Sequence, residues 1–597
     1  MGARSGSRFL PSRSKGLDSV SAPLARVYDG RTDRPAPRTA LGSATLERHT
    51  HMATMTGGRA VVEALIAQGV TTVFGIISVH NLHIFDALRG AEEQGRIRFV
   101  GGRHEHALAF MADGYARATG KPGVLVTSSG PGAADSVGGL GESFHSSIPI
   151  LHVTTDIERD LVGKGKGSTH EAREQLRMFE SVAGWTSLAA SVADIPHQIA
   201  AAMNHLRTAH PRPAVVAVPT DLLAATADVE IIPPREAAPA RASDTALAEA
   251  ARLLAHAERP LVWAGNGVMM GDAGDELLRL AERLQVPIVA GDGGKGVAPE
   301  DHPLALGSGL GARLWGANPI HDYLPTCDAV LVAGASLPYR STKGVGLRFP
   351  ENLIHVDIDP GVFGRNYPAK VGLAGHVKAV LGQLLDAMPS SVARPAGYRM
   401  ELQRLKGRIH AGVESQFPNE LRLWEGIRKV IDKDAIVVVD SAMVGYAAQR
   451  CFTVYEPRSF HGPHGWVSVG HAFPASLGMK AAYPDRQVIC VTGDGGFQYN
   501  MQELGTAIQH GLAPVVVLFN DNAWGALKWY QERQFDRRFF GVDLINPDFR
   551  KLAAAYEITA TRVDTVEQLL WNLQGALTTD RIQLIEVMTP AGVAGLV

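Results

Sequence analysis

The sequence predicts an α/β protein built from three doubly wound domains, each with a mostly parallel β-sheet. The chain has 597 residues. A single hydrophobic core seldom supports a chain of this length, so several domains are expected. Apolar segments with helical and with strand-like spacing alternate in three successive blocks, as the βα units of parallel sheets do. Two stretches rich in Pro, Ala or Ser, residues 232–244 and 388–397, separate these blocks and are expected to be linkers.

The first domain is predicted over residues 53–230. Residues 58–69 carry apolar side chains at helical spacing and end on a Gly, and residues 72–75 have the length and character of a buried strand. Helix and strand patterns then alternate up to a Val-rich strand at residues 213–219.

The second domain is predicted over residues 245–388 and the third over residues 412–597. The second begins with a helix near Thr245 and has strands at 260–265 and 353–357 and a helix near 376–385. The third has strands at 435–439, 487–491 and 515–519, with a helix from about residue 500 to residue 510.

Composition excludes several classes of protein. The formal net charge is -2 and no basic aromatic stripe is present, which disfavours binding to nucleic acid. The longest apolar runs have the length of strands, so no membrane span is expected. The three cysteines have no CxxC spacing, which argues against a disulfide framework or a Cys-based zinc site and favours a reducing, cytoplasmic location.

Residues 1–52 differ from the rest and are expected to form an extension without a catalytic role. Four basic residues, Arg4, Arg8, Arg13 and Lys15, precede the first acidic one. The main interpretation is a disordered tail or a start codon placed too early, and organellar import is the alternative.

The strongest motif lies in the third domain, where a strand runs into Gly493-Asp494-Gly495-Gly496. Glycines at a strand-to-helix turn let backbone amides approach a phosphate, and the helix start favours an anion. Asp494 would repel a diphosphate unless a hard cation such as Mg²⁺ bridges them. Asp521 follows the next strand, 521 − 494 = 27 positions later, and parallel strand ends lie at one edge of a sheet. The pattern therefore predicts a diphosphate and Mg²⁺ site.

Residues 493–525 resemble the cofactor motif of enzymes that depend on thiamine diphosphate (ThDP, thiamine pyrophosphate), in particular acetohydroxyacid synthases and benzoylformate decarboxylases. The likeness runs from about Gly57 to Pro590 in the family's domain order. It implies pyrimidine-binding, central and diphosphate-binding domains and a small 2-oxo acid as substrate. It also implies a homodimer or homotetramer with active sites at the interface, where Glu105 of one subunit faces Asp494 of another.

The resemblance implies three metal ligands: Asp494, Asp521 and the main-chain carbonyl of Ala523. Asn520 matches the first Asn of the family motif, whereas Asp521 stands where a second Asn is usual. This departure keeps an oxygen ligand but adds a negative charge. Trp524 and Gly525 close the motif and are expected to contact the cofactor.

Residues 102–120 are similar to the family segment that holds the catalytic glutamate, which Glu105 matches. A buried carboxyl group can donate a proton to the pyrimidine nitrogen of ThDP and so favour the tautomer that activates the thiazolium C2. Burial should raise the pKa of such a group. Val469, in residues 466–474, matches the apolar side chain that supports the bent cofactor, and a plain core position is the alternative.

The central domain is similar to one that binds FAD in acetohydroxyacid synthases, ADP in relatives that handle acyl-CoA, and nothing in many others. Gly265-Asn266-Gly267 and the acids near residues 355–359 are a weak dinucleotide signal without GxGxxG. Three alternatives are therefore left open for the central domain: FAD, ADP or no bound nucleotide.

Three departures from the synthases concern the substrate. His80 follows the strand end where Pro-Gly is usual, and it is a candidate proton shuttle or a helix cap. Tyr530 stands where the synthases have Trp over the substrate channel, and the chain stops soon after Pro590 without their long C-terminal arm. His170 and Glu171 either face the substrate or belong to a solvated loop rich in Gly and Lys.

The expected activity is decarboxylation of a 2-oxo acid followed by carboligation of the remaining fragment to a second carbonyl. The alternatives are a decarboxylase without ligation, a lyase of 2-hydroxyacyl thioesters and a non-catalytic homologue. The last predicts damage at Glu105 or Asp494, and both residues are intact.

Overall fold

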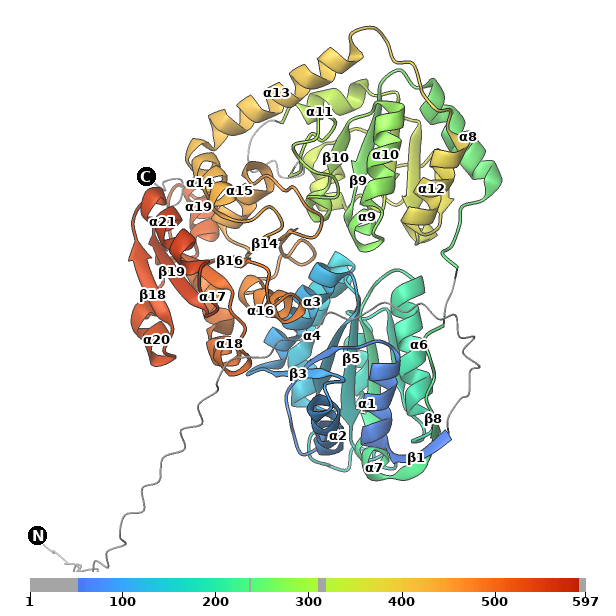
Figure 1. Cartoon of the computed structure of the whole chain (residues 1–597), viewed down its shortest axis with the longest axis vertical. Coiled ribbons are helices and arrows are strands. Elements are labelled where there is room, and N and C mark those ends of the chain that lie inside the picture. Colours follow the sequence, from blue (N-terminus) through green and yellow to red (C-terminus); the bar gives the residue numbers. More distant parts are fainter. Residues whose placement is uncertain (1–51, 236–237, 310–317, 590–597) are drawn as a thin grey trace, which may run out of the picture. The chain divides into compact units, whose positions relative to one another are not determined.

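A computed structural model describes residues 52–235, 238–309 and 318–589 (Figure 1). Within these residues the strands form three parallel sheets and one antiparallel pair. Helices alternate with the strands of each sheet, which confirms the predicted fold class. Among the described residues, no helix combines the length and hydropathy that a membrane crossing requires.

The first sheet has the strand order β3-β2-β4-β5-β7-β6. Its central strands are buried on both faces, as parallel strands between helical layers must be, and they are mostly apolar, although β5 also carries buried polar side chains. The strands are β2 (Thr72–Gly75), β3 (Arg98–Gly101), β4 (Gly123–Thr127), β5 (Ile150–Asp156), β6 (Trp185–Leu188) and β7 (Ala214–Pro219). The helices are α1 (Gly57–Ala67), α2 (Leu82–Glu93), α3 (Glu105–Thr119), α4 (Pro131–Ser146), α5 (Gln175–Phe179), α6 (Ile195–Thr208) and α7 (Thr220–Ala224). The antiparallel pair is β1 (Met52–Thr56) with β8 (Thr226–Glu230).

The second sheet has the order β10-β9-β11-β12-β13. Its strands are β9 (Pro260–Ala264), β10 (Ile288–Ala290), β11 (Ala329–Ala333), β12 (Leu353–Asp357) and β13 (Val371–Ala374). The helices around it are α8 (Asp244–His256), α9 (Asn266–Met270), α10 (Gly274–Leu284), α11 (Ile320–Tyr323) and α12 (Val377–Ala387), and α13 (Tyr398–Gln416) follows.

The third sheet has the order β15-β14-β16-β17-β19-β18. Its strands are β14 (Ile436–Val439), β15 (Phe460–His461), β16 (Val488–Gly493), β17 (Val515–Asn520), β18 (Thr559–Val563) and β19 (Gln583–Met588). The helices are α14 (Pro418–Val430), α15 (Met443–Cys451), α16 (Ala472–Ala482), α17 (Asp494–Asn500), α18 (Leu504–His510), α19 (Gly525–Gln534), α20 (Phe549–Ala555) and α21 (Val566–Ala576).

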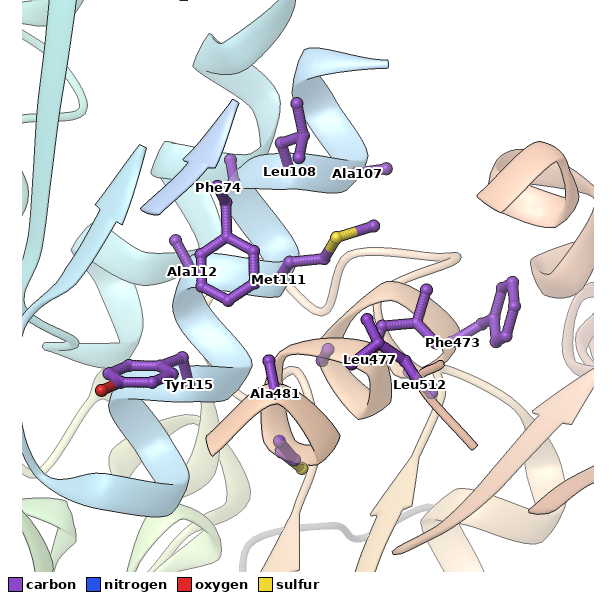
Figure 2. Close-up of a cluster of buried hydrophobic side chains, with 14 of the residues drawn as sticks. Phe74, Ala107, Leu108, Met111, Ala112, Tyr115, Phe473, Leu477, Ala481 and Leu512 are labelled. Atoms are coloured by element: carbon purple, nitrogen blue, oxygen red, sulfur yellow. The ribbon is translucent and has the colours of Figure 1, made fainter. Parts of the chain in front are cut away.

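Helix α3 of the first block packs closely against α16 of the third. Figure 2 shows Met111 and Tyr115 of α3 in one buried cluster with Leu477 and Ala481 of α16. The backbones touch at two glycines. A Cβ at Gly478 would lie 1.9 Å from the carbonyl oxygen of Met111, and one at Gly114 would lie 2.1 Å from that of Ala475. Only glycine permits this approach, so the crossing fixes the two helix starts relative to each other.

The structure differs from the expected elements in two places. The helix predicted from residue 500 begins at Asp494 and is divided into α17 and α18 by a short 3₁₀ turn, so the acid sits on the helix itself. The linker predicted at 388–397 leads into the 19-residue helix α13, ahead of the start predicted for the third block.

The extension and the end of the chain lie almost wholly outside the described residues. Of the predicted extension only Met52 is described, and it begins β1. Pro590 and the residues after it lie outside the described part of the chain.

Candidate active site

A cavity of about 510 Å³ lies at the carboxyl ends of β14, β16 and β17. In a doubly wound sheet this edge is where ligands bind, because helices begin there and neighbouring strands diverge. The residues that the sequence assigned to the diphosphate half of the site all line this cavity: Val469, Gly493, Asp494, Gly495, Gly496, Asp521, Ala523, Trp524 and Gly525.

Two helices start at this cavity. The first residues of α17, Asp494 to Gly496, line it, as do Ala442 and Met443 at the start of α15. The first N–H groups of a helix lack partners within the helix and favour anions such as phosphate. Gly495 has no room for a side chain, because a Cβ there would lie 2.5 Å from the Trp524 ring. The α15 start was missed in the sequence, although Asp440 at the end of a third strand could have indicated it.

Asp494 and Asp521 are two acidic groups at neighbouring strand ends. Burial raises the pKa of Asp494. Burial, and then the negative charge of Asp494, raise the pKa of Asp521 to about 7. Two partly desolvated carboxylates side by side repel each other, and a cation between them would offset this repulsion. Among the described residues, no three His, Cys, Asp or Glu side chains gather as a metal site, so a cation here needs further oxygens from carbonyl groups or phosphate. This all-oxygen set fits Mg²⁺.

Asn546 contacts the site residue Asp494, and no sequence motif pointed to it. Its Nδ2 donates hydrogen bonds to Asp494 Oδ2 at 2.6 Å and to Asn520 Oδ1 at 2.9 Å. Asn520 Nδ2 in turn donates to the buried Glu586 Oε1 at 2.7 Å. Asn520, the first Asn of the motif, therefore belongs to a hydrogen-bond network that orients Asp494. Asn520 itself does not line the cavity.

Glu105 is the first residue of α3 and is half-buried. It packs against the start of α4, where a Cβ at Gly132 would lie 2.9 Å from Glu105 Oε1. Burial, and then the charge of Asp135, raise the pKa of this carboxyl group, in the direction that the sequence predicted. Glu105 does not line the cavity of Asp494 in the same chain.

His80 contacts His170 and does not line the Asp494 cavity. Its ring stacks on that of His170, with the ring centroids 4.4 Å apart. His170 Nδ1 is 3.4 Å from Ser128 Oγ, and the Ser128 side chain also approaches the Gly132 position that Glu105 touches. Burial, and then the charge of His170, lower the pKa of His80. The two histidines selected from separate loops therefore contact each other, and Ser128 links them to the Gly132 position that Glu105 touches.

Tyr530, which was singled out near the substrate channel, is not among the residues that line the Asp494 cavity. Its neighbour Trp529 does line the cavity, and the two rings meet edge-on with their centroids 5.2 Å apart.

A second cavity, of about 370 Å³, lies at the carboxyl ends of β9, β11 and β12. Gly265 and Gly267 line it, and a Cβ at either would lie within 3 Å of the backbone of Gly334. Asp357 ends β12 in the same wall, and burial raises its pKa to about 6. A turn of closely packed glycines beside a strand-end acid suits the ribose and phosphate of a nucleotide.

Comparison with known proteins matches all three blocks to one family. The models for the thiamine pyrophosphate enzyme N-terminal TPP binding domain, central domain and C-terminal TPP binding domain match residues 55–178, 247–384 and 440–587. A probable 2-ketoarginine decarboxylase of Pseudomonas aeruginosa is 33% identical over 537 residues, covering 89% of this chain and 94% of the relative.

Acetolactate synthases are also similar. A probable large subunit from Methanocaldococcus jannaschii is 30% identical over 558 residues, covering 89% of this chain and 92% of its own. The isozyme 3 large subunit of Escherichia coli is 29% identical over 541 residues, covering 88% and 93%. The chain therefore belongs to the thiamine pyrophosphate enzyme family and is a ThDP-dependent enzyme that acts on 2-oxo acids.

Proposed function

We propose that this enzyme decarboxylates a 2-oxo acid with ThDP and Mg²⁺ and releases the remaining fragment as an aldehyde. When bound, ThDP would supply a nucleophilic carbon for the 2-oxo group and a thiazolium ring that accepts the electrons left by the loss of CO₂. The observation that carries the choice of product is the stacked pair of His80 and His170, which Ser128 links to the Gly132 position that Glu105 touches. Release of an aldehyde needs a proton donor at the reacting carbon, whereas ligation needs protons to be kept away.

The residues of the first cavity would hold the cofactor. Asp494, Asp521 and the carbonyl of Ala523 would hold Mg²⁺, while the starts of α15 and α17 would bind the diphosphate. Trp524 and Gly525 would border the diphosphate, and Val469 would support the bent form of the cofactor.

Glu105 would complete the site of a second copy of the chain. Its raised pKa suits a carboxyl group that holds a proton at the pyrimidine nitrogen of ThDP. Because Glu105 and Asp494 do not share a cavity within one chain, we propose a homodimer, or a homotetramer built from such dimers. Mixing Glu105→Gln chains with Asp494→Ala chains should then restore activity, because mixed dimers contain one intact site. Two inactive variants that stay inactive after mixing would contradict this arrangement.

His80 would deliver the proton that leads to the aldehyde, and His170 would replace it. Two stacked imidazoles cannot both be charged without repulsion, and the charge of His170 lowers the pKa of His80. A protonated His80 is therefore a stronger acid than an isolated imidazole and gives up its proton more readily. It is neutral after each transfer and must take up a proton before the next one.

Carboligation, as in an acetolactate synthase, is the second candidate. Several relatives at about 30% identity carry that name, and the motif at residues 493–525 resembles theirs. A lyase of 2-hydroxyacyl thioesters would use the same cofactor site with a different substrate.

The experiment is product analysis with purified protein, ThDP and Mg²⁺. Pyruvate and 2-ketoarginine serve as substrates, the second because a relative is named for it. Aldehyde and CO₂ would support the decarboxylase, while acetolactate from pyruvate would overturn it in favour of ligation. His80→Ala should lower aldehyde formation by about 10²- to 10⁴-fold if this side chain is the proton donor. Glu105→Gln should keep ThDP bound but lower turnover of every substrate, and unchanged turnover would overturn the whole assignment.

We propose that the second cavity takes a nucleotide. The glycines at residues 265–267 and Asp357 support an adenosine diphosphate moiety there, from either FAD or ADP. The visible absorbance of the purified protein tests for FAD, and equilibrium dialysis with labelled ADP tests for the nucleotide alone.

A further inference from the structure

The loop between β15 and α16 forms one wall of the cofactor cavity. Val469 in this loop lines the cavity directly. Two bonds tie the loop to the end of β14, because Gly470 N donates to Asp440 Oδ1 at 3.0 Å and Ser441 Oγ donates to the Val467 carbonyl at 2.8 Å. The position of Val469 therefore depends on the conformation of the loop.

The loop contains an unfavourable backbone conformation. Val467 has φ of 60°, in the left-handed region that β-branched residues rarely occupy. Such a residue keeps this conformation only where surrounding contacts hold it. The loop therefore needs a support outside its own sequence.

That support comes from Glu142 on α4, which is completely buried. Its carboxylate accepts hydrogen bonds from three loop amides: Gly465 N at 2.9 Å, Trp466 N at 3.0 Å and Ser468 N at 3.2 Å. The Ser468 hydroxyl adds a fourth at 3.1 Å. The bonds lie on both sides of Val467, so one carboxylate fixes the residues before and after the strained one.

Helix α4 is shaped to let the loop come this close. A Cβ at Gly141 would lie 2.1 Å from the Trp466 ring, and a Cβ at Gly465 would lie 2.7 Å from Ser146 N. Burial alone would raise the pKa of Glu142, but the Arg117 guanidinium and further donors outweigh it and lower the pKa. The ionised carboxylate is thus the form that the site favours.

We infer that Glu142 is a positioning residue for the cofactor site: it holds Val467 in the left-handed region and thereby fixes Val469 against the cofactor. The inference rests on the proposed function for the role of Val469. Glu142 belongs to the first block, whereas the loop that it holds belongs to the third. Glu142 itself does not line the cavity, so it acts only through the loop.

The test compares ThDP affinity in Glu142→Gln with that in the double variant Glu142→Gln/Val467→Gly. The amide keeps the size of the side chain but cannot accept all four bonds. The half-saturating ThDP concentration, followed by quenching of tryptophan fluorescence in saturating Mg²⁺, should rise roughly 5- to 100-fold in Glu142→Gln. Val467→Gly should restore most of this loss, because glycine adopts a positive φ without strain.

Ser146→Ala is the matched control. Ser146 Oγ donates to Glu142 Oε1 at 2.7 Å but does not belong to the loop, so ThDP affinity should stay within about 2-fold of wild type. Affinity in Glu142→Gln that is unchanged, or a loss that Val467→Gly does not restore, would overturn the inference.

A second measurement needs no cofactor. Hydrogen exchange of the amides of Gly465, Trp466 and Ser468 should be faster in Glu142→Gln than in wild type, and Ser468→Ala offers a milder change if Glu142→Gln does not fold. Wild-type protein that fails to bind ThDP would overturn the proposed function, whereas unchanged exchange would overturn the role of Glu142. The two failures are thereby distinguished.

Discussion

His471 Nε2 donates a hydrogen bond of 2.8 Å to Asp113 Oδ1, and both side chains are completely buried where α16 crosses α3. Asp113 also pairs with Arg117 and accepts a bond from Ser143 Oγ at 2.9 Å. His471 directly follows the loop that lines the cofactor cavity, so this cluster anchors the far end of that loop. The crossing that joins the first and third blocks is thus held by charge as well as by apolar packing.

Replacing Asp113 by Asn should lower the free energy of unfolding by about 3–5 kcal/mol, because it removes the carboxylate that pairs most closely with the buried Arg117. Chemical denaturation followed by fluorescence measures this. Glu93→Gln, which removes an exposed pair with Arg89, should leave the value nearly unchanged, because water screens such a pair.

Asp113 also has a predicted dependence on pH. Burial alone would raise the pKa of this carboxyl group, but Arg117 and the hydrogen bond from His471 lower it well below its usual range. Its stabilising effect is therefore present above the ordinary carboxyl pKa and is lost as pH falls towards the folded value. The difference between wild type and Asp113→Asn should shrink in acid, and a constant difference would contradict this.

The glycine contact between α3 and α16 predicts a second effect on stability. Gly478→Ala should destabilise the protein by about 1–3 kcal/mol or more, because the new Cβ meets the Met111 carbonyl. Gly382 in α12 has no atom within 4 Å of its Cβ position, so Gly382→Ala should instead stabilise by about 0.5–1 kcal/mol. Melting midpoints of the two variants that shift in the same direction would contradict the assigned crossing.

The strand-end residues were predictable from the sequence because topology alone places them. Asp494 and Asp521 follow apolar runs of strand length one βα unit apart, and parallel strands bring such residues to one edge. The strand bounds agreed closely for the same reason, since buried parallel strands are continuous apolar runs.

The supporting residues were not predictable in this way. A polar residue within a helix, such as Glu142 or Asp113, usually predicts a solvated face, and their burial depends on a loop more than 300 positions away. Asn546 lies between α19 and α20 without any periodic pattern. His170 follows a loop rich in Gly and Lys, a composition typical of solvated loops, so the sequence did not predict its contact with His80.

The network around Asn520 predicts the effect of Asn546 on the metal. Asn546→Ala removes the donor that orients Asp494 and should lower Mg²⁺ affinity by about 10- to 100-fold, as loss of an outer-shell partner does. The Mg²⁺ dependence of ThDP binding measures this. Asn572→Ala, whose amide bonds only within α21, is the control and should have no effect.

Asp521, the second acid of the motif, should affect stability differently with and without Mg²⁺. In a chelator, Asp521→Asn should stabilise the protein by roughly 1–3 kcal/mol, because it removes a carboxylate that Asp494 repels. In saturating Mg²⁺ this advantage should shrink or reverse, since the cation then pairs with both acids. Melting midpoints with and without chelator test it, and an equal shift in both conditions would contradict a cation between the two groups.

The environment of Glu105 predicts the pH dependence of the reaction. Burial raises its pKa and Asp135 raises it further, whereas His104 lowers it. The protonated form is the one that can hold a proton at the cofactor nitrogen, so activity should fall as pH rises through the pKa of Glu105. Asp135→Asn removes a negative charge, lowers that pKa and should move the alkaline limb of kcat/KM to lower pH by up to about one unit. Asp86→Asn, a charge change on α2, should leave the limb in place. A limb that moves to higher pH in Asp135→Asn would show that the falling rate reports another group.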